Sequence, residues 1–169
     1  MKELIRLRVN GELREAAVEP QKLLLDVLRE DLALTGAKRG CDDSSCGACA
    51  ILIDGVPMLS CVAIASCYQG AEICTVEGIA PPGTLDPAQQ GFAEGGGSQC
   101  GFCTAGFVIS TKALLDGNPN PSLEEIREAL SGNLCRCTGY MQIYDSVKIA
   151  IERGEAARSA EVARALGGR

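Results

Sequence analysis

The segment Cys41-Asp42-Asp43-Ser44-Ser45-Cys46-Gly47-Ala48-Cys49, residues 41–49, decides the fold of this 169-residue chain. It gathers three cysteines, with four and then two residues between them, and a fourth cysteine, Cys61, follows after eleven more. Four thiolates in one place repel one another unless a cation lies among them, so this quartet indicates a metal site. A run of this spacing with a distant fourth cysteine is typical of plant-type [2Fe–2S] ligation.

Two glycines stand next to cysteines of this segment. Gly40 precedes Cys41, and Gly47 follows Cys46. A cluster-binding loop must turn several sulfurs inward over few residues, and glycine adopts the tight conformations that this needs. Backbone N–H groups of such a loop point at the cluster and help to set its reduction potential. The alternative, an apolar loop with cysteines as small hydrophobic residues, leaves the spacing unexplained.

A second quartet consists of two close pairs. Cys100 and Cys103 have two residues between them, and Cys135 and Cys137 have one. We expect the first pair at the start of a helix and the second pair between two helices, where helix N-termini stabilise a negatively charged cluster. An iron–sulfur cluster and a four-cysteine zinc site both remain open for this quartet. Structural zinc ligands usually have more than one residue between them, which favours iron–sulfur.

Composition narrows the classes of function. The net charge of −6 disfavours a nucleic-acid partner, whose phosphates would be repelled. Histidine is absent, which excludes Rieske-type clusters, His-ligated zinc and catalytic triads that need a histidine. We expect neither a membrane span nor a signal peptide, because the apolar stretches are too short. In a reducing cytoplasm, the even number of cysteines then indicates metal ligation rather than disulfides.

The first part of the chain has the pattern of a sheet wrapped over one helix. Alternating apolar residues predict the strands, and apolar residues at helical spacing predict a helix of about three turns. Asn10-Gly11 and Asp54-Gly55 mark hairpin turns. The expected elements are strands over residues 5–9 and 13–18, a helix over 24–32, and strands over 51–53, 56–61 and 72–76. Residues 1–78 are therefore predicted to form a ferredoxin-like β-grasp domain, with a metal-binding loop before the third strand.

The second part of the chain is predicted to be helical. Prolines and glycines in residues 78–83 mark the boundary. The pairs Asp86/Gln89 and Ser122/Glu125 predict capping boxes at two helix starts. The expected helices cover residues 87–94, 102–115, the stretch after 122, and 142–153, followed by a tail that is either frayed helix or disordered. Residues 84–157 are predicted to form a helical-bundle domain.

Several motifs resemble those of a known family. Cys46-Gly47-Ala48-Cys49, Asp54-Gly55 and Ser60-Cys61 are similar to the N-terminal cluster motif of the small iron–sulfur subunits of molybdenum hydroxylases. Gln99-Cys100-Gly101-Phe102-Cys103 and Gly132-Asn133-Leu134-Cys135-Arg136-Cys137-Thr138-Gly139-Tyr140 resemble the second motif. This is the family of xanthine dehydrogenase, carbon monoxide dehydrogenase, nicotinate and quinoline dehydrogenases and 4-hydroxybenzoyl-CoA reductase. The resemblance covers about residues 3–153.

The resemblance implies an α+β chain with two [2Fe–2S] clusters, one in a plant-ferredoxin-like domain and one in a helical-bundle domain. In the family, the second cluster lies nearer a molybdopterin on a large partner subunit, and the first relays onward to FAD on a medium subunit. Gln99 and Cys137 are implied to approach the pterin. The implied ligands are Cys41, Cys46, Cys49 and Cys61 for the first cluster and Cys100, Cys103, Cys135 and Cys137 for the second.

The function expected from this resemblance is electron transfer within a cytoplasmic oxidoreductase complex, a heterotrimer or its dimer. Substrate turnover would take place on a partner, so we expect no catalytic residue in this chain. A free-standing ferredoxin is the alternative, but it has no need of the second domain with Gln99. A zinc-stabilised interaction module is a third hypothesis, and it leaves the spacing of the first quartet unexplained.

The chain departs from its relatives in the loop of the first quartet. Asp42-Asp43-Ser44-Ser45 stands where xanthine dehydrogenases are glycine-rich. Aspartate adopts left-handed backbone conformations more readily than most residues, so the loop is still expected to form. Two acidic groups near the cluster are expected to disfavour its reduced form and so to lower its potential. Thr104-Ala105 lacks a proline of the family motif, which we expect to alter rigidity more than ligation.

Cys67 and Cys74 lie outside both quartets. We predict that they are small hydrophobic residues on or near a strand. A redox or disulfide role is the alternative, and their spacing gives it no support.

Overall fold

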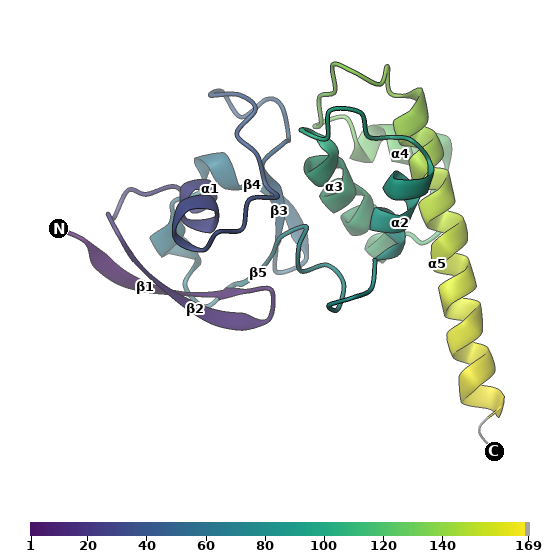
Figure 1. Cartoon of the computed structure of the whole chain (residues 1–169), viewed down its shortest axis with the longest axis horizontal. Coiled ribbons are helices and arrows are strands. Elements are labelled where there is room, and N and C mark those ends of the chain that lie inside the picture. Colours follow the sequence, from purple (N-terminus) through teal and green to yellow (C-terminus); the bar gives the residue numbers. More distant parts are fainter. Residues whose placement is uncertain (168–169) are drawn as a thin grey trace.

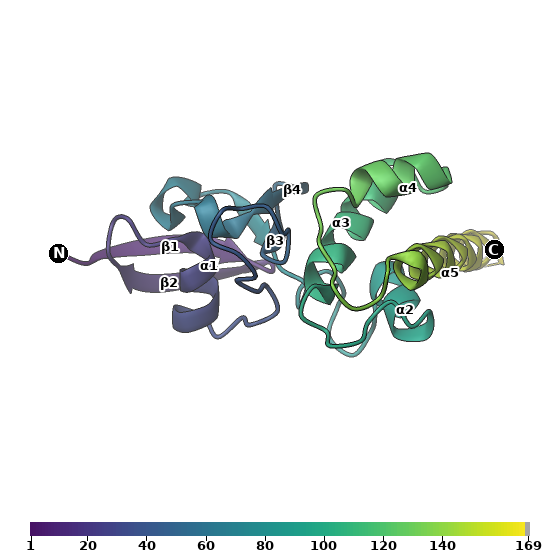
Figure 2. The same cartoon turned by 90° about the horizontal axis from the view of Figure 1, so that it is seen from above.

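The computed structural model describes residues 1–167, which fold into a lobe built on a sheet and a lobe of helices (Figure 1). Within these residues the sheet has five strands in the order β2-β1-β5-β3-β4. The strands are β1 (Glu3–Val9), β2 (Glu12–Val18), β3 (Ala50–Ile53), β4 (Val56–Leu59) and β5 (Glu72–Cys74). The α-helices are α1 (Leu24–Asp26), α2 (Pro87–Glu94), α3 (Thr104–Gly117), α4 (Leu123–Ala129) and α5 (Met141–Gly167). The chain is therefore mixed α/β, and its two lobes lie side by side along the long axis (Figure 2).

The N-terminal hairpin follows its sequence pattern. β1 pairs antiparallel with β2 along its whole length, from Glu3 opposite Val18 to Val9 opposite Glu12. The turn residue Asn10 has a φ of +54° and Gly11 a φ of +77°, the left-handed conformations that a two-residue hairpin turn needs. Ile5, Leu7 and Val9 are buried while the residues between them are exposed, so the predicted alternation is confirmed.

The helical segment after the hairpin has nearly the predicted bounds, but most of it is π-helix. α1 continues as a π-helical stretch over Val27–Asp31, so the segment covers residues 24–31 of the predicted 24–32 but is not α-helical throughout. The Leu32 N–H bonds the Val27 carbonyl at 3.0 Å, which widens the last turn, and Ala33 then takes a left-handed φ of +56°. Leu24, Leu25, Val27 and Leu28 of the predicted stripe are buried in the core of the sheet lobe, and Leu32 is partly buried against it.

β3 does not alternate as predicted, because all four of its residues are buried. Ile51 and Ile53 pack into the core of the sheet lobe. Ala50 and Leu52 point the other way and pack with Ile109 of α3. The helical lobe thus covers the second face of the sheet at this strand, so the two lobes share a hydrophobic contact directly after the cysteine segment.

The helical lobe begins its helices where the sequence predicts. Asp86 and Gln89 form a capping box at α2, and Ser122 and Glu125 form one at α4. Both capping boxes are therefore confirmed. The buried core between the helices consists of Ala88, Phe92, Phe107, Val108, Ile126, Leu130, Ile143 and Val147.

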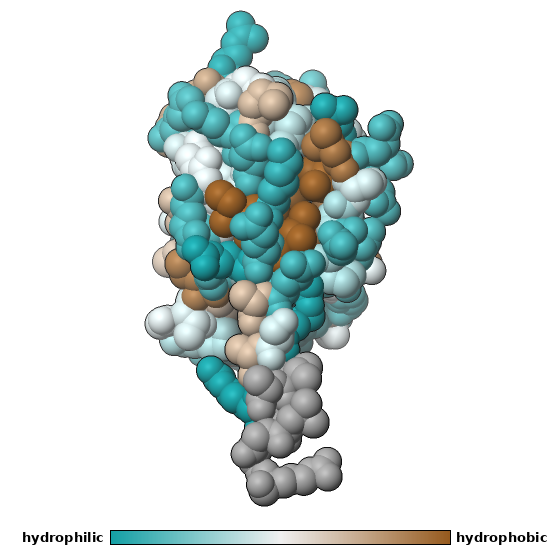
Figure 3. Space-filling model, turned by 90° about the vertical axis from the view of Figure 1, so that its right-hand side faces the viewer, coloured by the Kyte–Doolittle hydropathy of each residue, from teal (hydrophilic) through white to brown (hydrophobic). Residues whose placement is uncertain are grey.

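α5 is longer than the predicted 142–153, because the helix continues through the tail. Alanine, glutamate and arginine dominate residues 155–164, and all three favour helix. None of the described helices combines the length and the apolar character that crossing a membrane requires. Seen from the end of the helical lobe, the surface is mainly hydrophilic, with hydrophobic groups in short strips between polar ones (Figure 3).

Candidate metal centres

The β3–β4 hairpin sets the last two cysteines of the first quartet side by side. Ser60 lies opposite Cys49 and donates to its carbonyl through both N–H and Oγ, at 3.3 and 2.7 Å. The chain then turns into a 3-10 helix, Ser60–Val62, where the sequence predicts continued strand. This turn brings the Cys61 thiol into hydrogen-bonding contact with the Cys49 thiol. Both cysteines are buried.

Residues 35–49 form the predicted loop, and Cys41 and Cys46 make a second thiol pair within it. Its glycines have the tight packing that the sequence indicates. A Cβ on Gly40 would lie 2.9 Å from Cys46 Sγ. Gly47 has a φ of +68°, and a Cβ there would lie 2.3 Å from the Gly132 carbonyl oxygen of the helical lobe. The loop therefore has no room for a side chain where it approaches either the sulfurs or the other lobe.

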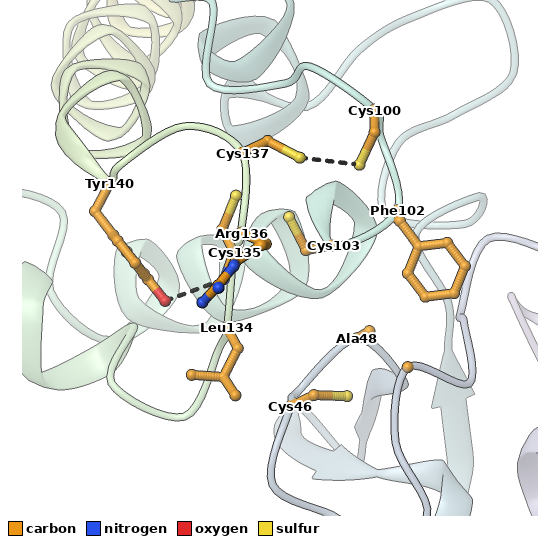
Figure 4. Close-up of a pocket in the computed structure, with 11 residues that line it drawn as sticks. Cys46, Ala48, Cys100, Phe102, Cys103, Leu134, Cys135, Arg136, Cys137 and Tyr140 are labelled. Carbon is orange, nitrogen blue, oxygen red and sulfur yellow. Dashed lines mark hydrogen bonds between the residues drawn. The ribbon is translucent and has the colours of Figure 1, made fainter.

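The second quartet lies where the loop between α4 and α5 meets the start of α3. Cys103 is the N-cap residue of α3, and Cys100 precedes it on an exposed segment. Cys137 Sγ lies 3.6 Å from Cys100 Sγ, and the Cys103 and Cys135 thiols contact each other (Figure 4). The quartet is thus two thiol pairs, each with one cysteine from the α3 segment and one from the loop.

Burial makes three of these thiols, Cys46, Cys61 and Cys103, costly to ionise unless a cation is present. Burial raises the pKa of Cys61 to about 12, with the neighbouring Cys49 thiol adding to the shift. The pKa of Cys103 is also raised to about 12, by burial and by contact with Cys135. For Cys135 itself burial acts in the same direction, but hydrogen bonds from Thr138 and from the Cys137 N–H outweigh it and lower the pKa to about 7. Thiolates in such places need a positive partner.

The pairing of the sulfurs fits a two-iron cluster better than a single zinc ion. Zinc gathers four sulfurs around one point, whereas the two irons of a [2Fe–2S] cluster take two sulfurs each. The two quartets form the pairs Cys41/Cys46, Cys49/Cys61, Cys100/Cys137 and Cys103/Cys135. Each donor set therefore suits one [2Fe–2S] cluster.

A cavity of about 530 Å³ opens between the two lobes at the quartets. It is lined by Gly40, Cys46, Ala48, Cys100, Phe102, Cys103, Leu134, Cys135, Arg136, Cys137 and Tyr140. The Phe102 ring reaches across from the helical lobe towards Ala48 and packs on Gly40 (Figure 4). The cavity therefore joins the sulfurs of the second quartet to Cys46 of the first.

Backbone and side-chain hydrogen bonds hold the two cysteine loops together. The Leu134 N–H donates to the Cys46 carbonyl at 3.0 Å. Asn133 is buried, and its Nδ2 donates to the Gly47 carbonyl at 3.2 Å while its Oδ1 accepts from Ser110 Oγ at 2.8 Å. Sequence reasoning quoted Asn133 only as part of the second cysteine motif, because its partner Gly47 lies 86 residues away and no local pattern indicates the bond.

The remaining predicted residues lie near the second quartet or outside both. Gln99 is exposed beside Cys100. Cys74 is half-buried and packs with Ala50, Leu52 and Ile109, as expected for a small hydrophobic residue. Cys67 is exposed on a 3-10 helix, so the prediction of a packed hydrophobic residue was wrong there. Its neighbourhood is a short turn at the surface, which apolar patterning does not distinguish from a strand edge.

Comparison with known sequences matches both lobes to iron–sulfur domains. The family model described as "2Fe-2S iron-sulfur cluster binding domain" matches residues 7–72, and "[2Fe-2S] binding domain" matches residues 75–148. The chain is 49% identical to the nicotinate dehydrogenase small FeS subunit of Eubacterium barkeri, over 88% of this chain and 95% of the relative. It is 50% identical to the nicotine 6-hydroxylase small subunit of Paenarthrobacter nicotinovorans, over 85% and 86% of the two chains.

A solved structure has the same fold. A chain of quinoline 2-oxidoreductase from Pseudomonas putida 86 superposes with a TM-score of 0.86 at 44% identity, covering 92% of this chain and 97% of that one. The matched length therefore spans both lobes and nearly the whole of the relative. The chain belongs to the family of small iron–sulfur subunits of molybdenum hydroxylases and carries two [2Fe–2S] domains.

Proposed function

We propose that this chain relays electrons between a molybdopterin site on a large partner subunit and FAD on a medium partner subunit, through two [2Fe–2S] clusters. The observation that carries the proposal is that two cysteine quartets, each made of two thiol pairs, lie on loops that a hydrogen bond joins. The chain that contains them matches small subunits along nearly their whole length. Relatives of this kind are subunits of complexes, so a free-standing ferredoxin is not the function. Substrate turnover belongs to the partners.

The proposed cluster ligands are the eight cysteines of the two quartets. Cys41, Cys46, Cys49 and Cys61 would hold the first cluster, and Cys100, Cys103, Cys135 and Cys137 the second. The proposed domains are a ferredoxin-like β-grasp over residues 1–78 and a helical bundle over residues 84–157. The residues between them, 79–83, contain neither helix nor strand, which supports a boundary there.

The second cluster is proposed to face the molybdopterin subunit. Cys100, Cys137 and Gln99 are exposed, and the exposed apolar side chains of Phe102 and Leu134 lie close by. Apolar groups around an exposed redox centre suit a surface that a protein partner covers. Gln99 and Cys137 are the proposed contacts with the pterin, because both stand on the outer side of the quartet.

Between the clusters, the hydrogen bond from the Leu134 N–H to the Cys46 carbonyl gives a direct connection. Cys46 is a proposed ligand of the first cluster, and Leu134 is bonded directly to Cys135 of the second. Electrons would therefore cross from one lobe to the other over a single hydrogen bond. We further propose a heterotrimer or its dimer in the cytoplasm, where a reducing medium keeps all ten cysteines out of disulfides, as they are here.

Metal analysis of the purified complex tests the proposal. We expect about four irons and four sulfides for each copy of this chain, no zinc, and two distinct S = 1/2 signals in low-temperature EPR after reduction. Cys103→Ser should remove about two irons and one signal, whereas Cys67→Ser should leave both unchanged. Zinc in place of iron at the second quartet would break the proposed path, and zinc alone would refute electron transfer.

A further inference from the structure

The loop of the second quartet contains a hydroxyl group aimed at one of its sulfurs. Thr138 Oγ1 lies 3.2 Å from Cys135 Sγ. The same oxygen accepts a hydrogen bond from the Tyr140 N–H, also at 3.2 Å. Because the N–H occupies an acceptor position of the oxygen, the single hydrogen of the hydroxyl is left to point at the sulfur. Thr138 is therefore a hydrogen-bond donor to Cys135.

Tyr140 holds this arrangement from two sides. Its backbone φ of +70° is unusual for a bulky residue and follows a left-handed Gly139 with φ +63°, and this turn directs the Tyr140 N–H back to Thr138. Its phenol oxygen accepts the Cys135 N–H at 3.0 Å. Strained backbone of this kind persists only where the surroundings determine it.

The strain is supported by aromatic packing beneath the loop. The Tyr140 ring meets Phe107 edge to face, with centroids 6.2 Å apart and an angle of 74° between the planes. On its other side it lies 6.4 Å from the ring of Tyr144. Phe107 is fully buried in the core of the helical lobe, so the tyrosine is anchored to the rigid part of that lobe.

We propose that Thr138 tunes the reduction potential of the second [2Fe–2S] cluster by donating a hydrogen bond to its ligand Cys135, and that Tyr140 is the positioning residue that holds Thr138 there. The inference rests on the proposed function, because it takes Cys135 as a cluster ligand. Reduction adds a negative charge that is shared with the cysteine sulfurs, so a donor to sulfur stabilises the reduced form more than the oxidised form. Thr138 thus raises the potential.

The side-chain groups beside the first quartet differ from those beside the second. Within residues 1–167, no hydroxyl donates to the sulfurs of this quartet. The two hydroxyls adjacent to its cysteines in sequence donate elsewhere: Ser45 Oγ to Asp43 Oδ1 and Ser60 Oγ to the Cys49 carbonyl. A carboxylate, Asp43, lies against Cys41. The chain therefore supplies a donor at one cluster and a negative charge at the other, which separates the two potentials in a defined direction.

EPR-monitored redox titration of the intact complex tests the inference. Thr138→Val keeps the shape of the side chain and removes the hydroxyl. We expect the equilibrium constant for one-electron reduction of the second cluster to fall tenfold, which makes its reduction potential about 59 mV more negative. Thr138→Ser should stay near the wild-type potential, and Thr138→Ala should shift as the valine variant does. Thr104→Val is the matched control, since Thr104 also follows a cysteine but bonds Ser98 Oγ instead of a sulfur.

The role of Tyr140 has its own variant. Tyr140→Phe removes the acceptor of the Cys135 N–H but keeps the backbone N–H to Thr138, so a smaller negative shift of the second cluster is expected. An unchanged potential in both Thr138→Val and Thr138→Ala would overturn the proposal, as would an equal shift in Thr138→Ser. Absence of two cluster signals from the wild type is a different result, which refutes the proposed function rather than the role of Thr138.

Discussion

Asp43 and Thr138 each lie beside a cysteine sulfur, but they present groups of opposite character. Asp43 Oδ1 accepts from both the N–H and the Oγ of Ser45, at 3.2 and 2.7 Å, and these bonds hold its carboxylate in place. The pKa of Asp43 is lowered chiefly by the Ser45 hydroxyl, so the group is charged at neutral pH. Both centres have cysteine ligands, so they differ in the side chain that lies next to a sulfur: a carboxylate at the first and a hydroxyl at the second.

Replacing Asp43 with asparagine should raise the potential of the first cluster, because it removes a negative charge that disfavours the added electron. Asparagine keeps an oxygen that can accept the bonds from Ser45, so the loop should survive. Redox titration followed by EPR measures the change. Asp42→Asn is the control, since Asp42 is the neighbouring aspartate and is also exposed; an equal rise in both variants would mean that net charge, and not the placement of Asp43, sets the potential.

At the scale of elements, the loop of residues 35–49 is shaped by its contact with the helical lobe. Gly47 combines a φ of +68° with a carbonyl oxygen of Gly132 only 2.3 Å from where a Cβ would stand. The left-handed conformation alone costs a side chain about 1–2 kcal/mol. The steric conflict with backbone adds to that cost, because backbone cannot move aside as a flexible side chain does.

Gly47→Ala is therefore expected to destabilise the protein by clearly more than Gly55→Ala. Gly55 has a φ of +81° but no other atom within 4 Å of where a Cβ would stand, so its substitution isolates the conformational cost of about 1–2 kcal/mol. Denaturant unfolding of both variants measures the difference. Equal losses would mean that the two cysteine loops separate without penalty.

The capping box of α4 gives an acid-sensitive helix start. The pKa of Glu125 lies below its ordinary value of 4.5, mainly because the Ser122 hydroxyl bonds to its carboxylate. A carboxylate whose pKa is lower in the folded state than in the unfolded state stabilises the fold at pH values above its unfolded pKa. This stabilisation is lost as the pH falls through the folded-state pKa. The contribution should therefore disappear below pH 4.5. Ser122→Ala should cost about 1 kcal/mol at neutral pH and less in acid, measured as melting temperature against pH.

The sequence predicted an element correctly where residues close together in the chain determine it. Ile5, Leu7 and Val9, the turn at Asn10-Gly11 and both capping boxes depend on neighbours within a few residues, and all were confirmed. The strand β3 was predicted, but its alternating burial was not found, because Leu52 packs on Ile109, a residue of the other lobe. Periodicity within a strand carries no information about a second layer that arrives from a distant part of the chain.

For the molecule as a whole, the cysteine spacing predicted two metal quartets but not how they meet. The pairing of each sulfur depends on the fold, since Cys100 and Cys137 come together across 37 residues. Asn133 and Gly47 are 86 residues apart, and the hydrogen bond between them has no local signal in the sequence. The predicted site residues were therefore accessible from motif and spacing, whereas the residues that fix one quartet against the other were not.

Asn133 is expected to hold the two lobes in one orientation. Asn133→Ala leaves the Ser110 hydroxyl and the Gly47 carbonyl without their buried partner, which should cost about 1–3 kcal/mol. Because the lost bond to the Gly47 carbonyl lies between the lobes, we expect calorimetry to show one unfolding transition for the wild type and two for the variant. The magnetic interaction between the two reduced clusters, visible as splitting in EPR at low temperature, should weaken as their separation becomes less well defined.

Asn120→Ala is the matched control, because Asn120 is exposed and distant in sequence from both cysteine loops. It should leave both the unfolding profile and the splitting as in the wild type. If Asn133→Ala lowers stability but keeps one transition and the full splitting, the asparagine contributes to the helical lobe alone. The lobes would then be aligned by the Leu134–Cys46 hydrogen bond and the packing of Leu52 on Ile109, contacts that the substitution leaves in place.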